Sequence, residues 1–238
     1  MVYVGTSGWN YLHWKGIFYP EGLPQARWLQ HYVKFFNCVE LNVTFYRLVK
    51  KETFQNWRKR TPEDFYFVAK GSRFITHIKK LKDISQPLNL FLDNARGLRD
   101  KLALVLWQLP PSFKKDIKRL TLFFKLLKKT NLRHSFEFRN ESWFDSEVYR
   151  LFKEYNFCLC IAHSPRFPCQ RVITADFLYL RFHGKELLYG SNYSDKELKA
   201  WAEFAREFKK QKDIFAFFNN DARGFAVKNA LRFRELLK

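Results

Sequence analysis

The sequence predicts an α/β fold, a single (β/α)8 barrel of the TIM type over residues 1–238. Short apolar segments alternate with amphipathic segments along most of the chain, as in parallel strands joined by helical crossovers. There are eight such strand segments, the number that closes a barrel of this type. No linker or low-complexity tract divides the chain, so we expect one domain.

The strands are assigned from short runs that are apolar throughout or at every second position. They span residues 2–6, 38–42, 65–70, 102–108, 135–139, 157–162, 177–182 and 214–218. The fourth run, LALVLWQ, is apolar almost throughout, which is typical of a strand covered on both faces. The fifth run carries Phe136 and Phe138 on one face and Ser135, Glu137 and Arg139 on the other.

Helices are expected where apolar residues recur at spacings of three and four. The candidate segments are 24–36, 53–60, 88–95, 116–129, 148–155, a segment after Ser194, and 226–237. Ser194 and Glu197 form a capping box at the start of the penultimate helix. The connection 163–176 contains two prolines and shows no helical pattern, so the sixth crossover is expected to be irregular. A doubly wound open sheet is the alternative fold.

The charge is strongly positive, with 43 Lys and Arg against 23 Asp and Glu and a net charge of +20. Such an excess favours an anionic partner, either nucleic acid or a phosphorylated small molecule, although solubility alone explains it equally well. The four cysteines form no CxxC pair, which indicates free thiols in a reducing compartment. With no leader pattern and no apolar run of about 20 residues, a cytoplasmic protein without membrane contact is expected.

Polar residues gather at the carboxyl ends of the predicted strands, whereas the strand bodies are apolar. They are Thr6, Ser7, Glu40, Asn42, Lys70, Gln108, Glu137, Arg139, His163, Arg181, His183, Asn219, Asn220 and Asp221. Active sites of (β/α)8 barrels lie at this end of the strands. We therefore expect these side chains to converge on one polar, basic pocket.

Three of these residues are candidate catalytic groups. Glu137 and Glu40 have the chemistry of a general base or a metal ligand, and His183 that of an acid or base. The alternatives are structural: Glu137 and Arg181 neutralise each other in the core, and His183 is a hydrogen-bonded structural residue.

The cations and amides are candidate ligands for an anionic substrate. Lys70, Arg139 and Arg181 suit phosphate or carboxylate, since the arginine fork binds two oxygens at once. Lys70 also suits neutralisation of Glu40. The run Asn219-Asn220-Asp221 contains two candidate ligands and, in Asp221, a candidate helix cap.

Metal binding and base stacking are two further readings. His77, His163 and His183 would join Glu40 and Glu137 around a divalent cation, but no HxH or HExxH spacing supports this, so no metal ligand is assigned and a divalent metal stays open as a cofactor. The loop after the first strand contains several aromatic residues, which either stack on nucleic-acid bases or pack over the mouth of the barrel. These are Trp9, Tyr11, Trp14, Phe18 and Tyr19.

The chain resembles the DUF72 (YecE-like) family in several ordered blocks from the first strand to the last helix. The blocks are GTSGWNYLHWKGIFYP, VELNVTFYRL, TPEDFYFVAKGSRFITH, LWQLPPSF, FEFRNESWF, YLRFHG and FNNDARGFAVKNA. The resemblance implies a TIM-barrel fold similar in outline to the endonuclease IV and xylose isomerase-like barrels, which use metals. It implies no established activity.

The resemblance also implies a set of recurring polar and aromatic positions. They are Ser7, Trp9, Glu40, Asn42, Tyr46, Lys70, His77, Gln108, Glu137, Arg139, Trp143, Arg181, His183, Asn219 and Asn220. One position departs from the family pattern: His163 stands where members commonly have an aspartate before a Ser-Pro turn. Any acidic or ligand role of that aspartate is then performed differently here, or not at all.

The expected function is that of a hydrolase acting on nucleic acid or on another phosphate-bearing substrate. The alternatives are a non-catalytic nucleic-acid-binding module, and an enzyme or binder of a small anionic metabolite. The sequence leaves the oligomeric state undetermined.

Overall fold

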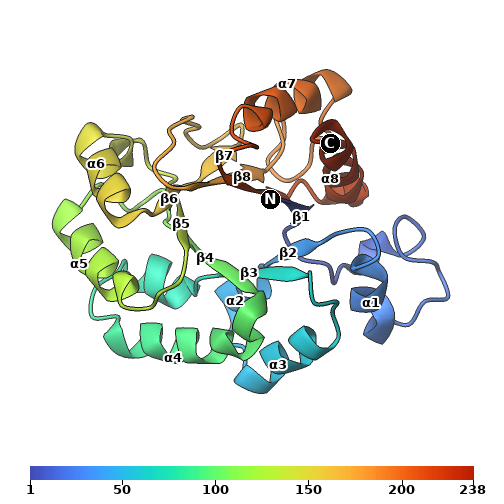
Figure 1. The fold of residues 1–238 in the computed structure, drawn as a ribbon, viewed down its shortest axis with the longest axis horizontal. Helices are drawn as coiled ribbons and strands as arrows, with labels where there is room; N and C mark the ends of the chain where they lie inside the picture. The colour runs from blue at the N-terminus through green and yellow to red at the C-terminus, as the bar shows by residue number, and fades with distance from the viewer.

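The computed structural model describes residues 1–238 and has parallel strands at the centre with helices around them (Figure 1). The strands are β1 (Val2–Thr6), β2 (Cys38–Leu41), β3 (Tyr66–Lys70), β4 (Leu102–Gln108), β5 (His134–Glu137), β6 (Cys158–Leu159), β7 (Ile161–His163), β8 (Phe177–Phe182) and β9 (Asp213–Phe218). They form two sheets, in the orders β1-β9-β8-β7 and β2-β3-β4-β5-β6. The predicted α/β class is confirmed.

Eight α-helices follow or connect the strands. They are α1 (Trp28–Tyr32), α2 (Val43–Tyr46), α3 (Lys51–Lys59), α4 (Ser85–Ala95), α5 (Ile117–Lys128), α6 (Ser146–Tyr155), α7 (Asp195–Arg206) and α8 (Phe225–Leu236). Both groups of the capping box are in place, since Ser194 Oγ accepts from Glu197 N and the Glu197 carboxylate accepts from Ser194 N. Helix α2 and a π-helical turn, Phe74–Ile78, were not predicted, because four or five residues are too few to show a helical period.

The sixth predicted strand lies where the two sheets meet. Its first part, β6, pairs with β5, and its last part, β7, pairs with β8. Cys160 lies between them, and its N–H donates to the carbonyl of Phe136. No helix forms between β7 and β8, as the two prolines in this crossover predict. At the other junction, β1 and β2 are paired by a single bridge between Ser7 and Glu40.

Side chains alternate between an outer and an inner core, as successive residues of a strand must. On β3, Phe67 and Ala69 belong to the outer core beneath the helices, whereas Val68 belongs to the inner one. The inner core takes Tyr179 and Phe217 from one sheet and residues such as Leu104 from the other. The two sheets therefore enclose one apolar interior.

Toward the carboxyl ends of the strands, the inward-facing positions change from apolar to polar. Glu40 follows Cys38 at a spacing of two, Lys70 follows Val68, and Arg181 follows Tyr179. Because a spacing of two keeps a side chain on the same face, these groups enter the same interior above the apolar residues.

The cysteines and the lengths of the helices bear on two expectations from the sequence. All four cysteines are free thiols, as predicted, and three of them are buried. None of the helices combines the length and the apolar character needed to span a membrane.

Candidate functional site

A buried cluster of charges joins the two sheets at the carboxyl ends of the strands. Arg181 of β8 donates from Nε to Glu40 Oε2 at 2.9 Å, from Nη2 to Glu40 Oε1 at 2.5 Å, and from Nη1 to Glu137 Oε2. The three side chains are at most 1% exposed. Glu40 and Glu137 belong to one sheet and Arg181 to the other, so the ion pairs hold the sheets together.

Glu40 has every carboxylate oxygen occupied by protein donors. Besides Arg181, Ser7 Oγ donates to Oε1 at 2.7 Å and Tyr179 Oη donates to Oε2 at 2.6 Å. Burial raises the pKa of this carboxyl, but the charge and hydrogen bonds of Arg181 outweigh burial, so the pKa lies below its ordinary value. Glu40 is thus an ionised structural acceptor.

Glu137 lies between two guanidinium groups. Its Oε1 accepts from Arg139 Nε at 2.7 Å, and its Oε2 accepts from Arg181. Burial again raises its pKa, but the charges of Arg181 and Arg139 hold it well below the ordinary value. The ion pair between Glu137 and Arg181 that the sequence left as an alternative is present.

His183 is a fully buried neutral histidine beside this pair. Asn219 Nδ2 lies 3.2 Å from its Nδ1, and its Nε2 lies 3.4 Å from Glu137 Oε2 and 3.3 Å from Arg181 Nη1. Burial lowers the pKa of His183 to about 4, although the Glu137 charge acts in the opposite direction. Asn219 lies between His183 and the pocket, since it lines the pocket and is bonded to the histidine ring.

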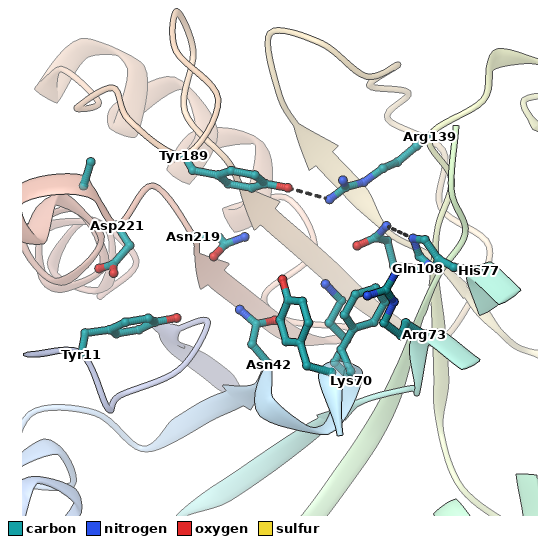
Figure 2. A pocket seen from close by; sticks show the side chains of 13 residues that line it. Tyr11, Asn42, Lys70, Arg73, His77, Gln108, Arg139, Tyr189, Asn219 and Asp221 are labelled. Atoms are coloured by element: carbon teal, nitrogen blue, oxygen red, sulfur yellow. Dashed lines mark hydrogen bonds between the residues drawn. The ribbon is translucent and has the colours of Figure 1, made fainter. Parts of the chain in front are cut away.

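Above the charge cluster, a cavity of about 690 Å³ opens at the carboxyl ends of the strands (Figure 2). It is lined by Tyr11, Asn42, Phe45, Tyr46, Lys70, Arg73, His77, Gln108, Arg139, Tyr189, Asn219, Asp221 and Ala222. Lys70, Arg73 and Arg139 are its cations and Asp221 its single carboxylate. The predicted polar, basic pocket is thus formed by residues of the predicted strand ends and of the loops that follow them.

The three cations differ in how they are held. Arg139 is fixed by Glu137 and donates from Nη2 to Tyr189 Oη at 3.0 Å. Arg73 is exposed, lies at the start of the turn that follows β3, and forms no ion pair or hydrogen bond through its guanidinium group. Lys70 is 6% exposed, and its Nζ lies 4.3 Å from the centre of the Phe45 ring.

His77 and Gln108 form a polar pair on the cavity wall. Thr76 Oγ1 donates to the carbonyl of Ser72, so it accepts a hydrogen bond from His77 Nδ1 at 2.9 Å. His77 Nε2 is then the acceptor for Gln108 Nε2 at 3.3 Å. Burial, with the charge of Lys70 next, lowers the pKa of His77 to about 4, so this histidine is neutral.

Asp221 faces the cavity instead of capping a helix, so the cap prediction is wrong. Its side chain makes no cap hydrogen bond. It accepts from Trp14 Nε1 at 2.6 Å and lies 2.9 Å from His13 Nε2. Burial raises its pKa to about 6, against the lowering effect of the Trp14 hydrogen bond. The aromatic loop thus places a carboxyl group on the pocket wall.

Most aromatic side chains of that loop are packed into the protein. Trp14 and Tyr19 are buried, and Tyr19 stacks on Trp28 with ring centres 4.6 Å apart. Trp9 packs edge-on against Trp57, outside the cavity, and Tyr11 lines the cavity. Of the two readings of this loop, the structure matches packing over the mouth for most of its residues.

The predicted site residues divide into those that line the cavity and those that lie elsewhere. The cavity residues are Asn42, Tyr46, Lys70, His77, Gln108, Arg139 and Asn219. Ser7, Glu40, Glu137, Arg181 and His183 lie buried beside them in the hydrogen-bonded cluster. Asn220 is turned away and donates to Ser191 O and Asn229 Oδ1, while Trp143 packs on Phe138.

His163, the position that departs from the family pattern, also points away from the cavity. Its Nδ1 accepts from Tyr193 Oη at 2.8 Å, and its ring packs against Trp201. Burial lowers its pKa, so it contributes a neutral hydrogen-bonded side chain to the outer core.

The side chains considered as metal ligands do not form a ligand set. His77, His163 and His183 are each bonded to a different neutral partner, and both glutamates are paired with arginine. No group of three or more His, Cys, Asp or Glu side chains is placed to hold a metal ion.

Five cavity residues were given no site role from the sequence: Phe45, Arg73, Tyr189, Asp221 and Ala222. Arg73 and Tyr189 lie in loops after β3 and β8, where no strand pattern marks them. Their position in loops at the carboxyl ends of strands is the one signal that points to them.

Comparisons with known proteins agree with the resemblance seen in the sequence. The model of the family described as "Protein of unknown function DUF72" matches residues 3–238. The UPF0759 protein YunF of Bacillus subtilis is 28% identical to this chain and the match covers 100% of this chain and 95% of YunF.

Two solved structures show how far the likeness extends. A DUF72 family protein from Thermotoga maritima is 33% identical, with a TM-score of 0.89 over 100% of this chain and 99% of that one. PbGH5A, a glycoside hydrolase family 5 enzyme from Prevotella bryantii, is 11% identical, with a TM-score of 0.53 over 99% of this chain and 95% of that one, and shares the fold alone. With a family model matched over nearly its whole length, the chain belongs to the DUF72 family, whose function is unknown.

Proposed function

We propose that the cavity binds a small phosphate-bearing molecule and that the protein acts on it as an enzyme. The observation that carries this proposal is the composition of the lining: the guanidinium groups of Arg73 and Arg139 and the amine of Lys70 face a single carboxyl group, that of Asp221. The volume of about 690 Å³ is that of a small-molecule site. Figure 2 shows these three basic side chains around the cavity, Lys70 and Arg73 from β3 and the turn after it, and Arg139 from the segment after β5.

Arg73 and Arg139 suit complementary tasks in holding a phosphate. Arg139 is fixed by Glu137 and Tyr189 with Nη1 free of protein partners, so it offers a preorganised donor. Arg73 is exposed and unpaired, so it can close on a bound anion. Guanidinium groups bind phosphate with two parallel hydrogen bonds, which are among the strong ones in proteins.

Replacing Arg73 with alanine is expected to weaken phosphate binding by at least tenfold, because a hydrogen bond to a charged group contributes about 1.5–3 kcal/mol. The measurement is isothermal titration of the protein with inorganic phosphate and with a small phosphate monoester. Arg27→Ala is the matched control, since Arg27 is also exposed and lies outside the cavity. Equal affinities of Arg73→Ala and wild type, or no phosphate binding by wild type, would contradict the proposal.

Hydrolysis of a phosphate ester is the reaction class we propose, with Asp221 as the group that takes a proton from water. Glu40, Glu137 and His183 were the candidates from sequence, but their partners keep them out of the cavity lining, so the proposal assigns them no proton transfer. The pKa of Asp221, raised to about 6, lies near neutral pH, where a general base works best.

Asp221→Asn is expected to lower hydrolysis by about a hundredfold or more, since general base catalysis contributes about 10²–10⁴. Wild-type activity should rise with pH through about 6, because the base is active when ionised. Phosphate release from a panel of phosphate monoesters and strand cleavage of short oligonucleotides are measured. Asp213→Asn, at the opposite end of β9, is the control and should retain activity. Absence of wild-type turnover across the panel would overturn the hydrolase proposal and leave phosphate binding to its own test.

Nucleic acid is the second candidate ligand, favoured by one side chain at the cavity mouth. Tyr46 is 71% exposed and lines the cavity, so its ring can stack on a terminal base while the phosphate lies below. The net charge of +20 acts in the same direction. Oligonucleotide binding that falls steeply with salt, and is stronger than that of the monoester, would favour this candidate.

We also propose that residues 1–238 are one domain. In it, the two sheets form a (β/α)8-type barrel that is open at the two junctions between the sheets. The shared inner core, the bridge between Ser7 and Glu40, and the passage of the sixth strand from one sheet to the other support it. A site at the carboxyl ends of the strands is where such a barrel carries its chemistry.

A further inference from the structure

Lys70 is a buried amine without a partner that would hold a proton on it. Its Nζ makes no hydrogen bond and lies within ion-pair distance of no carboxylate, and the Phe45 ring is its near neighbour at 4.3 Å. Buried lysines normally pair with an acid or donate to several carbonyls. Lys101 shows the normal case here: it is 4% exposed and donates to the carbonyls of Arg58 and Thr61 and to Thr61 Oγ1.

The charges around Lys70 already balance without it. Glu40 and Glu137 are ionised, Arg139 and Arg181 compensate them, and both nearby histidines are neutral. A proton on Lys70 is therefore an uncompensated buried charge. Burial, followed by the charge of Arg181, lowers the pKa of Lys70 to about 7, so a large share of the amine is neutral at physiological pH.

We propose that Lys70 is a nucleophile that forms an imine with an aldehyde or ketone group of the ligand in the cavity. The inference rests on the proposed function, because the phosphate of that ligand, held by Arg73 and Arg139, would bring the carbonyl to the amine. It narrows the substrate class to a phosphate-bearing carbonyl compound. A neutral lysine in an apolar or cationic setting is the form that does this chemistry.

The step balances without any further reactant. The Nζ lone pair adds to the carbonyl carbon, a C–N bond forms, and one amine proton passes to the carbonyl oxygen to give a carbinolamine. The hydroxyl group then takes the second amine proton and leaves as water, while the nitrogen lone pair forms the C=N bond. The carbon is neither oxidised nor reduced.

Pyridoxal 5′-phosphate is the probe, since it is an aldehyde that carries a phosphate, and borohydride traps its imine as a secondary amine by supplying hydride. With probe below one equivalent per protein, peptide mapping by mass spectrometry should place most of the adduct on Lys70 among all the lysines. Inorganic phosphate should protect Lys70, and pyridoxal without the phosphate should label it at least tenfold more slowly. Lys101, buried but fully bonded, should stay unlabelled.

Lys70→Met should abolish the dominant adduct, and Arg73→Ala should slow labelling of Lys70 by pyridoxal 5′-phosphate but not by pyridoxal. Two results would contradict the proposal that Lys70 is a nucleophile: an adduct spread evenly over surface lysines, or Lys70 left unlabelled in a protein that binds inorganic phosphate in the titration. Neither result would contradict the proposed function. Rapid labelling of Lys70 by both probes without protection by phosphate would support the nucleophile and contradict phosphate binding.

Discussion

Arg181→Met is expected to destabilise the protein by at least 3–5 kcal/mol, the usual cost of removing one partner from a buried ion pair. The loss should lie at the upper end, because Arg181 is the partner of two buried carboxylates, Glu40 and Glu137. Since a domain is stable by about 5–15 kcal/mol, the variant should be partly unfolded or close to it. Urea unfolding followed by circular dichroism measures the change.

The pH dependence gives this prediction a signature that a general packing defect lacks. In wild type the pKa values of Glu40 and Glu137 are lowered by folding, so their stabilisation is present above the unfolded pKa of about 4.3 and is lost as pH falls. Without Arg181, burial should raise the pKa of Glu40, whereas Glu137 keeps its ion pair with Arg139, so the contribution of Glu40 should instead increase stability as pH falls.

A matched series separates charge from shape. Adding Glu40→Gln and Glu137→Gln to Arg181→Met should recover much of the stability, because the buried charges that lost their partner are then absent. Arg139→Met should cost less, since that side chain is 11% exposed and Glu137 retains Arg181. An Arg181→Met variant as stable as wild type at neutral pH would contradict the structural role assigned to the cluster.

Lys70→Met is expected to stabilise the protein at neutral pH, by up to about 5 kcal/mol. The pKa of Lys70 falls from 10.5 in the unfolded chain to about 7 on folding, and each unit corresponds to about 1.4 kcal/mol. Between pH 7 and 10 the unfolded chain binds this proton and the folded protein does not, so wild-type stability should rise with pH across that interval. The variant should lose this slope.

The measurement is the free energy of unfolding of wild type and of Lys70→Met from pH 6 to pH 10. Lys101→Met is the control, because Lys101 is buried but satisfied by three acceptors, and its loss should destabilise the protein. If Lys70→Met is less stable than wild type at pH 7, with the same slope, Lys70 carries a compensated charge and the amine is not the reactive form. A stabilising substitution at a cavity residue would mark that residue as kept for function.

Much of the architecture was predictable because it depends on local patterns. The period of two in β5 separated Phe136 and Phe138 from Glu137, and the two phenylalanines do pack under the helices while Glu137 enters the interior. The capping box at Ser194 was equally local. The sixth strand was found, but its division between two sheets at Cys160 depends on which neighbour each half pairs with, and no local pattern encodes that choice.

The convergence of the polar strand ends was predictable from the sequence, but the partners of each side chain were not. Alternation along parallel strands was enough to bring Glu40, Lys70, Glu137 and Arg181 to the same end of one interior. Which of them reach the cavity depends on depth and on partners across the sheets, set by register and by the loops that cover the mouth. Asp221 shows this most clearly, since the same residue reads as a helix cap in sequence and becomes a cavity carboxyl because Trp14 and His13 hold it there.

Local periodicity and ordered motifs were therefore enough to predict the α/β class, the family resemblance and the end of the strands that carries the polar groups. Only the three-dimensional arrangement shows that Arg181 pairs with both glutamates, that Arg73 and Arg139 have donors free to bind an anion, and that Lys70 has no partner. The pairing of charges, and the pKa values that follow, depend on distances between residues far apart in the chain, such as Arg181 and Glu40, which are 141 positions apart.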